Sequence, residues 1–460
     1  MSTLNDIIIN KQELLNLAGD RSTVSLRSLI VRGIEKTFTE LNPGYKIKRE
    51  LSLNNGWLYW EGKGLIHNVE KIYIIAIGSL AEEMMLGALE ALRGTHSFIK
   101  GMVTIPFASQ PRLKTPDVEI IRANPQFFDG NAIRVAKTAQ SIIKEASGND
   151  VIIYLLSPGA RTMIAYPKEP LSPSHLEEVR FKLSRVGATP LEISQVLAHL
   201  DQVKGGQLIS INPLAYHLSL TVAHVSNHEF QVIGDGITYP DPSTYKHVEF
   251  ILQKYNVWEK LDAKIKTVIN KGINRELPET KKPGSKAFKR HGSFLLANTK
   301  VFVTQLADYF QKAGRLPSVI LTDNFVADPQ SIGRLAASFT SATGLNRPYA
   351  LIMAGKIQSK RVANDSPVTD AAIAAMPFLK ERKKDVLVFL DTGGKDGHMT
   401  YAGVILTPQK SEEILKDTAK VIQLKGGFNE KIIREHHLAI EIKQGVGAYG
   451  HLIIVISGEQ

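Results

Sequence analysis

The sequence predicts an α/β protein of two domains, each with a largely parallel sheet flanked by helices. Two observations lead to this prediction. The chain has 460 residues, which is more than a single hydrophobic core usually supports. Short and continuously apolar segments also alternate with longer amphipathic segments. This alternation is typical of strands that are buried on both faces between covering helices.

The first part of the chain predicts a helix followed by a doubly wound, Rossmann-like sheet. In the helix expected over 22–43, apolar residues recur at helical spacing, Ser22 or Thr23 can cap the start, and Pro43 ends it. Apolar runs such as KIYIIAIGS then predict buried strands that end in turn-forming residues. The expected strands are 71–79, 100–107, 118–124 and 150–160, with helices at 80–94 and 131–148.

A domain boundary is expected within 274–293, which is rich in Pro, Gly and charged residues. The predicted domains are therefore 1–285 and 286–460, the second being a smaller α/β domain. In such domains, ligands bind where the carboxyl ends of the strands meet the loops. The expected helices of the second domain are 298–314, 328–344, 370–384 and 411–423, and its strands are 318–323, 349–355, 385–391 and 451–457.

Composition excludes several classes of protein. The formal charge is +11, with basic clusters at 280–292, 359–361 and 380–384, but no aromatic ladder interleaves with them, so no nucleic-acid partner is expected. No apolar run approaches the ~18–20 residues of a membrane span, and the first twelve residues do not resemble a secretory leader. We therefore expect a cytoplasmic protein with no membrane contact. The absence of cysteine excludes disulfides, thiolate catalysis and cysteine-ligated zinc.

Two glycine-containing turns are candidates for phosphate binding. In Lys-Gly-Gly, the residues Gly205 and Gly206 allow backbone N–H groups to approach an anion while Lys204 supplies positive charge. Ser157 and Gly159 follow a predicted strand and could open a helix whose N-terminus attracts phosphate. The alternative for both is an ordinary turn without a ligand.

A third candidate is the loop DTGGKDGHMTYAG at 391–403. Gly393 and Gly394 could admit a phosphate, and Asp396 could hold a magnesium ion. A plain glycine turn is again the alternative. The histidines of HLSLTVAHVSNH lack the spacing of a metal-binding helix, and no G-x-S-x-G nucleophile turn occurs.

Taken in order, these loops resemble the glycerate 2-kinase family, some of whose members are also labelled hydroxypyruvate reductases. The resemblance is carried by GATPLEISQVLAHLDQVKGGQL (187–208), TYPDPSTYKHVEFILQKYNV (238–257), ELPET (276–280) and TGGKDGHMTYAG (392–403). It implies two α/β domains with a cleft between them, and magnesium- and ATP-dependent phosphorylation of the 2-hydroxyl of D-glycerate. On this basis the cofactor-binding residues would be Ser157, Gly159, Gly205, Gly206, Gly393 and Gly394, with Asp396 on the metal.

The chain departs from the family pattern at charged positions. Ser79 stands where the family has a lysine, and His224 and His228 replace two aspartates. By resemblance, Lys204 would contact phosphate, Arg161 could replace a lost cation because arginine forks bind phosphate, and His224 could serve as a base.

Two functions follow from the resemblance and its departures. The first is a divergent kinase acting on a small hydroxy acid and a nucleotide, with Lys204, Arg161 and His224 as its catalytic groups. The second is a family member that has lost phosphoryl transfer. It would bind a metabolite or nucleotide, or serve as a regulatory or structural subunit, as a homo-oligomer or paired with an active homologue.

Overall fold

The computed structural model describes residues 7–16, 21–95, 97–107, 109–225, 227–341, 346–358, 366–379, 384–425, 429–443 and 445–459. The chain forms two compact units. The parallel-sheet unit comprises 43–223 and 227–296, and the mixed-sheet unit comprises the described residues of 1–42, 224–226 and 297–460. Two basic stretches noted in the sequence, 359–361 and 380–383, lie outside the described residues. No helix in the described part of the chain is long and apolar enough to span a membrane.

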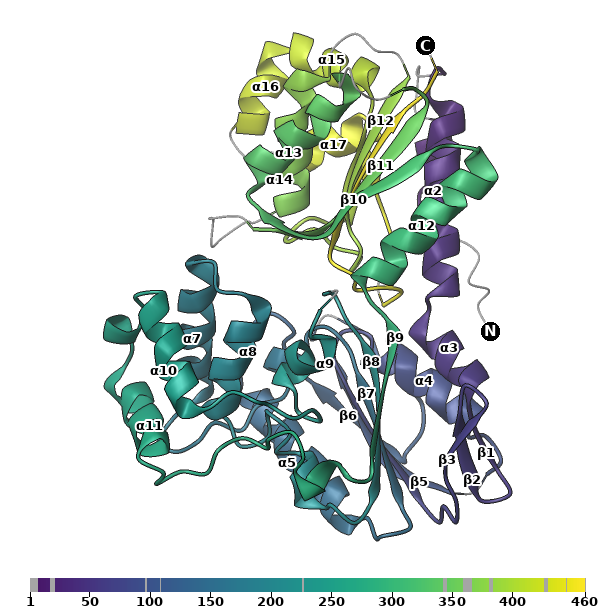
Figure 1. Ribbon diagram of the computed structural model, residues 1–460. Coiled ribbons are helices and arrows are strands. Elements are labelled where there is room, and N and C mark those ends of the chain that lie inside the picture. The colour runs from purple at the N-terminus through teal and green to yellow at the C-terminus, as the bar shows by residue number, and fades with distance from the viewer. Residues whose placement is uncertain are drawn as a thin grey trace. The chain divides into compact units, whose positions relative to one another are not determined.

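The parallel-sheet unit contains a six-stranded sheet of order β6-β5-β4-β7-β8-β9 (Figure 1). Its first five strands in this order all pair in parallel. The chain winds outward from β4 through β5 to β6, and then returns to add β7 and β8 on the other side of β4. The loops after β4 and β7 therefore lie at the switch point of a doubly wound sheet. The strands are β4 (Ile72–Ile77), β5 (Phe98–Ile105), β6 (Val118–Arg122), β7 (Val151–Leu156), β8 (Tyr216–Val222) and β9 (His291–Ala297).

Helices of the parallel-sheet unit fall into two groups. Some cover the sheet, whereas α7, α8, α10 and α11 form a separate helical cluster (Figure 1) with a buried apolar core of its own. A small antiparallel sheet of β1 (Leu51–Asn54), β2 (Trp57–Trp60) and β3 (Lys63–Ile66) completes the unit. The helices are α3 (Pro43–Glu50), α4 (Ala81–Ala91), α5 (Gly130–Glu145), α6 (Ala160–Met163), α7 (Pro173–Arg185), α8 (Pro190–His199), α9 (Glu229–Val232), α10 (Tyr245–Lys254) and α11 (Ala263–Ile273).

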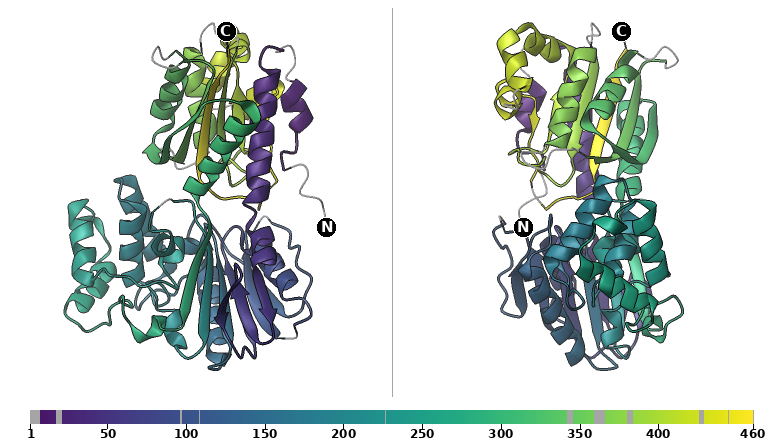
Figure 2. Two further views of the ribbon diagram at one scale, coloured as in Figure 1. Left: turned by 45° about the vertical axis from the view of Figure 1, so that its right-hand side comes forward. Right: turned by 90° about the vertical axis from the view of Figure 1, so that its left-hand side faces the viewer.

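The mixed-sheet unit contains a second six-stranded sheet, of order β10-β11-β15-β12-β13-β14. Helices α13 to α17 lie on one face of this sheet, and α2 and α12 lie on the other (Figures 1 and 2). The strands are β10 (Ser318–Ala327), β11 (Tyr349–Ile357), β12 (Asp385–Asp391), β13 (Gly403–Leu406), β14 (Ala439–Ile440) and β15 (His451–Ser457). The helices are α1 (Lys11–Asn16), α2 (Val24–Glu40), α12 (Thr299–Gly314), α13 (Pro329–Ser338), α14 (Pro367–Ala375), α15 (Pro408–Lys416), α16 (Thr418–Lys425) and α17 (Asn429–Glu435).

The structure confirms the two-domain α/β class and the parallel sheet of the first domain. The second sheet is mixed rather than largely parallel, because only β10 and β11 pair in parallel while the other pairs are antiparallel. The chain between β12 and β13 is a loop without a helix, which is too short for a parallel crossover. Continuous apolar strands arise whenever both faces of a sheet are covered, so their composition alone does not set strand direction.

The domain division also differs from the predicted 1–285 and 286–460. Helix α2 packs on α12, where a Cβ placed on Gly33 would lie 2.8 Å from Tyr309 Cδ1 and 2.9 Å from Phe310 Cε1. The first helices therefore belong to the mixed-sheet unit. At the other boundary, the chain after residue 285 continues into β9, the sixth strand of the first sheet, so that the units divide after Leu296. The segment rich in proline, glycine and charged residues is therefore a surface loop and not a domain boundary. It precedes β9, a strand of the same unit.

Candidate functional site

The loops after β4 and β7 are joined through Ser157. This residue is fully buried, and its Oγ accepts a hydrogen bond of 3.0 Å from the backbone N–H of Leu80. The N–H of Ser79 donates to the carbonyl oxygen of Pro158 at 2.8 Å. Gly78 has φ +125°, and a Cβ at this position would lie 2.2 Å from Ser157 Oγ. The contact between the two loops therefore requires glycine at position 78, and the hydroxyl of Ser157 is used in joining them.

Gly159 starts the short helix α6, which carries Arg161. Its φ of +91° lies in the left-handed region that favours glycine, and a Cβ would approach Pro125 Cβ to 2.9 Å and Ser79 Oγ to 3.0 Å. Helix α6 has only four residues, which gives it little dipole with which to attract a phosphate. The role visible for Gly159 is to turn the chain so that Arg161 points toward α8.

The guanidinium of Arg161 is held by hydrogen bonds from two directions. Its Nε donates to Asp235 Oδ1 at 2.6 Å, and its Nη2 donates to Ser194 Oγ at 2.7 Å and to the carbonyl oxygen of Pro190 at 3.2 Å. Ser194 and Pro190 both belong to α8. The side chain of Arg161 remains 21% exposed. A cation thus lies at the surface of the unit in a fixed orientation.

Lys204 lies beneath Arg161 and is fully buried. Its Nζ donates to Asp235 Oδ2 at 2.9 Å and to the carbonyl oxygen of Arg161 at 2.7 Å, and it lies 5.4 Å from the ring centroid of Phe128. Asp235 therefore accepts one cation at each carboxylate oxygen. Because two positive groups share one negative group, this trio has a net charge of +1. Lys204 positions Asp235 and Arg161 and is too deeply buried to meet a ligand itself.

The two glycines after Lys204 have a structural role. The N–H of Gly205 donates to the carbonyl oxygen of Asp235 at 2.9 Å, and the N–H of Gly206 donates to that of Gly236 at 2.7 Å. Both glycines have positive φ, and a Cβ on Gly206 would lie 2.5 Å from Phe288 Cζ. These amides are satisfied within the protein, so they do not form the anion cradle expected from the sequence.

A shallow pocket opens beside the trio. It is small, with a volume of about 10 Å³, which is room for about one water molecule. Ser194 and Asp235, the two side chains that hold Arg161, contribute to its wall. The lining residues are Leu191, Ser194, Gln195, Ala198, Gly205, Gln231, Asp235, Gly236, Tyr239, Pro240, Asp241 and Pro242. The Lys-Gly-Gly turn and the Pro-Asp-Pro-Ser-Thr segment, which are far apart in the sequence, meet at this pocket.

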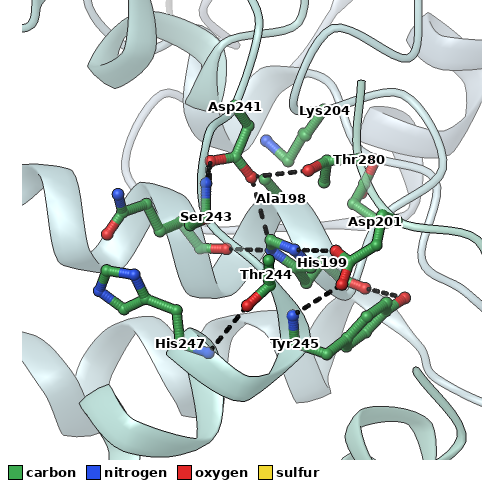
Figure 3. A network of polar contacts seen from close by, with 12 residues as sticks. Ala198, His199, Asp201, Lys204, Asp241, Ser243, Thr244, Tyr245, His247 and Thr280 are labelled. Atoms are coloured by element: carbon green, nitrogen blue, oxygen red, sulfur yellow. Dashed lines mark hydrogen bonds and ion pairs between the residues drawn. The ribbon is translucent and has the colours of Figure 1, made fainter. Parts of the chain in front are cut away.

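The wall of the pocket is backed by a polar network centred on His199 (Figure 3). The Nε2 of His199 lies 2.9 Å from Glu279 Oε2, and its Nδ1 lies 3.5 Å from Asp241 Oδ2. Asp241 also accepts hydrogen bonds from Ser243 and from Thr280 Oγ1. Burial alone would raise the pKa of Glu279, but hydrogen bonds from His199 and from the backbone N–H of Tyr245 outweigh it and lower this pKa to about 2.

A second part of the network surrounds Tyr245. Its hydroxyl donates to the carbonyl oxygen of His199 at 3.1 Å and accepts from Lys168 Nζ at 2.6 Å. Burial lowers the pKa of Lys168 to about 8. The network thereby ties α8 to α10 and to the segment around Glu279.

In the mixed-sheet unit, Asp396 caps helix α14. Its Oδ1 accepts from the N–H of Val368 at 3.1 Å, and its Oδ2 accepts from the N–H of Thr369 at 2.7 Å and from Thr369 Oγ1 at 2.6 Å. The side chain is fully buried, and burial raises its pKa to about 6. Both oxygens are therefore occupied, and the position does not suit the magnesium ligand expected from the sequence.

The glycines before Asp396 close the loop on itself. The N–H of Gly393 donates to Asp391 Oδ1 at 2.7 Å, and that of Gly394 donates to the carbonyl oxygen of Asp391 at 3.1 Å. Across the described residues, no group of three or more His, Asp or Glu side chains is placed to hold a metal ion. The loop has the geometry of a capped glycine turn.

The predicted site residues divide between the two units. Six predicted residues lie in the parallel-sheet unit, whereas Gly393, Gly394 and Asp396 belong to the mixed-sheet unit. His224 is exposed directly after β8 and groups with the mixed-sheet unit. The six that share a unit are Ser157, Gly159, Arg161, Lys204, Gly205 and Gly206.

Sequence reasoning missed Asp235, His199 and Glu279. Asp235 stands between two glycines in GDG, which marks a tight turn, but nothing local shows that its side chain meets two distant cations. His199 is the last residue of helix α8, and Glu279 lies 80 positions away in a charged loop. These pairings depend on tertiary structure.

Comparison with known proteins gives the family. Residues 29–270 match the model described as "Domain of unknown function (DUF4147)". The Glycerate 2-kinase of Pyrococcus horikoshii is 26% identical over 376 residues, covering 80% of this chain and 81% of its own length. The D-glycerate 2-kinase of Thermotoga maritima is 24% identical over 389 residues, covering 83% of this chain and 86% of its own length.

The fold agrees with this relationship. The crystal structure of a glycerate kinase from Thermotoga maritima superposes with a TM-score of 0.74 at 22% identity, covering 94% of this chain and 99% of that chain. The motifs, the fold and the match to more than half of the chain lead to one conclusion. The chain belongs to the DUF4147 family and is a divergent member of the glycerate 2-kinase family.

Proposed function

We propose that this protein binds D-glycerate or a related small 2-hydroxy acid at its surface around Arg161, over the mouth of the shallow pocket. The observation that carries the proposal is the oriented, partly exposed guanidinium of Arg161 beside a pocket that the Lys-Gly-Gly and Pro-Asp-Pro segments line. Arg161 is the exposed member of the trio, and its Nη1, which the bonds to Asp235, Ser194 and Pro190 do not use, can donate to a carboxylate oxygen. Substrates of this class are those named for the relatives.

The main role of the residues around Arg161 is to hold its guanidinium in place. Asp235 and Ser194 fix the orientation of the guanidinium before a ligand arrives, so little side-chain entropy is lost on binding. Lys204 keeps Asp235 neutralised from below. The pocket wall also carries the polar side chains of Gln195, Gln231 and Tyr239.

The residues predicted to hold ATP and magnesium fit these groups poorly. Asp396 is a buried helix cap, Gly205 and Gly206 donate their amides to carbonyl groups, and Ser157 Oγ joins two loops. We therefore assign no residue to the nucleotide or the metal. This observation favours binding without efficient phosphoryl transfer, in which case the protein serves as a metabolite-binding, regulatory or structural subunit.

The second candidate function is the activity named for the relatives, the ATP-dependent phosphorylation of the 2-hydroxyl of D-glycerate. It is favoured by the family match over 29–270 and by relatives that share about four-fifths of the chain. In that case Arg161 would orient the substrate carboxylate or hold a phosphate. Phosphoryl transfer depends on positioning and charge neutralisation, so the exposed cation is the group best placed to contribute.

A direct test separates the two candidates. The purified chain is incubated with ATP, MgCl₂ and D-glycerate, and phosphoglycerate is measured together with the melting temperature in D-glycerate alone. Thermal stabilisation without product supports binding without transfer. Product that disappears in R161Q but persists in R134Q supports the kinase. Arg134 is a suitable control because it is a 61% exposed arginine of the same unit. Neither stabilisation nor product would refute both candidates.

A further inference from the structure

The environment of His199 determines its protonation state. The imidazole is completely buried in α8 and has an oxygen atom opposite each ring nitrogen. Its Nδ1 lies 2.8 Å from the carbonyl oxygen of Gln195, and its Nε2 lies 2.9 Å from Glu279 Oε2. Both are hydrogen-bond distances.

Neither of these oxygens supplies a proton readily. A backbone carbonyl only accepts hydrogen bonds, and an ionised carboxylate also only accepts. A neutral imidazole carries one N–H, so one of its nitrogens would place a lone pair against an oxygen lone pair. Glu279 is 38% exposed to water, and a carboxyl group in contact with water is ionised at neutral pH. Both ring nitrogens of His199 donate a hydrogen bond to the oxygen that faces them only when both carry a proton.

Other charged groups around His199 are consistent with a positive ring. Asp241 Oδ2 lies 3.5 Å from Nδ1 and adds a second carboxylate. The ring of Tyr245 meets the imidazole edge-on at a centroid distance of 4.7 Å. Two cations belong to the same network: Lys282 Nζ lies 3.3 Å from Glu279 Oε2, and the buried Lys168 donates to the hydroxyl of Tyr245 at 2.6 Å.

We propose that His199 is a buried imidazolium that acts as a positioning residue for the pocket, holding α8 against Asp241 (Figure 3) and against Glu279. The proposal rests on the function proposed above, since it concerns the same pocket. Asp241 lies on the pocket wall. A positive His199 offsets this carboxylate, which would otherwise repel an anionic ligand. The same helix presents Ser194 to Arg161, so displacement of α8 would also release the guanidinium.

The protonation state is tested by NMR of protein labelled with ¹⁵N in its histidine rings, with the His199 signals assigned by their absence in H199Q. At pH 7.5, we expect both ring nitrogens of His199 to show protonated shifts. In E279Q, which keeps an oxygen acceptor but removes the charge, we expect one nitrogen to lose its proton. A wild-type signal typical of a neutral ring would overturn the proposal, as would a ring unchanged in E279Q. This result does not depend on glycerate binding.

The positioning role is tested by calorimetric titration of D-glycerate into the same variants. We expect H199Q to bind about tenfold more weakly than wild type, which corresponds to about 1.4 kcal/mol. His247 provides a matched control, because it is an exposed histidine on the neighbouring helix α10, and H247Q should bind as wild type does. Equal affinities of wild type and a folded H199Q would overturn the role in binding. If wild type itself fails to bind D-glycerate, the function proposed above fails, while the NMR result still decides the state of His199.

Discussion

The Nζ of Lys204 lies 2.9 Å from Oδ2 of Asp235, and both side chains are fully buried. Such a pair gains little net stability from its attraction, because each charge gives up its hydration. The role of this pair is to fix the position of neighbouring side chains. Asp235 binds Lys204 through one oxygen and Arg161 through the other, so the buried pair fixes the direction of an exposed cation.

Removal of Asp235 should therefore destabilise the protein strongly. In D235N, Lys204 keeps its charge in a buried position with its carboxylate partner gone, and we expect a loss of about 3–5 kcal/mol in the free energy of unfolding. Urea denaturation measures this loss. The double variant K204M/D235N removes both charges and should lose less than the sum of the two single variants.

A surface ion pair of the same unit serves as the control for this series. Lys266 and Glu259 are 3.2 Å apart, and Glu259 is 86% exposed. E259Q should change the free energy of unfolding by no more than about 0.5 kcal/mol. A D235N protein as stable as E259Q would show that Asp235 does not hold Lys204 in the folded state.

Substitution of Gly206 tests whether the Lys-Gly-Gly turn is structural. Gly206 and Gly62 have nearly the same φ, +76° and +74°. A Cβ at position 206 would clash with Phe288, whereas a Cβ at position 62 would meet open space. We expect G62A to cost about 1 kcal/mol, and G206A to cost a further ~1–3 kcal/mol from overpacking. If G206A were as stable as G62A yet lost nucleotide binding, the glycine would serve a ligand instead.

The burial of Asp396 predicts an unusual dependence of stability on pH, because it outweighs the capping hydrogen bonds that would lower the pKa of this group. Its pKa is raised to about 6 in the folded protein, compared with about 3.9 in an unfolded chain. The folded state therefore binds the proton more tightly, so this group favours folding below about pH 4, and the benefit is lost as pH rises through 6. The stability of wild type relative to D396N should fall across this window. A difference in stability between wild type and D396N that does not change with pH would contradict this prediction.

Glu279 predicts the opposite trend at lower pH. Its pKa is lowered to about 2, so its ionised form favours folding above the unfolded value of about 4.3, and this contribution is lost as pH falls through 2. E279Q should be less stable than wild type at pH 7, and the two proteins should converge in strong acid. Thermal unfolding between pH 2 and 7 measures the convergence. Parallel curves would exclude the ion pair with His199.

Several features could be predicted from the sequence because their signals are local. The fully apolar runs around Ile72–Ile77 and Val151–Leu156 became central strands, and the turns that follow them form the switch point of the first sheet. The Lys-Gly-Gly and Pro-Asp-Pro-Ser-Thr motifs, which are visible in the sequence, contribute residues to one pocket.

Features that depend on distant partners could not be predicted. Asp396 reads as a potential metal ligand in DTGGKDG, but its oxygens are used by the start of α14, which lies nearly thirty residues earlier in the chain. The partners of Lys204 and His199 are set by how α6, α8 and the loop before α10 pack. Strand direction in the second sheet likewise depends on topology, which apolar composition does not encode.

The most direct test of the account is a calorimetric titration of D-glycerate into wild type, R161Q and R134Q. Because Arg161 is the exposed cation of the trio, we predict saturable binding to wild type and R134Q, and affinity at least about tenfold weaker for R161Q. Equal binding to a folded R161Q, or no binding to wild type, would contradict a hydroxy-acid site at Arg161.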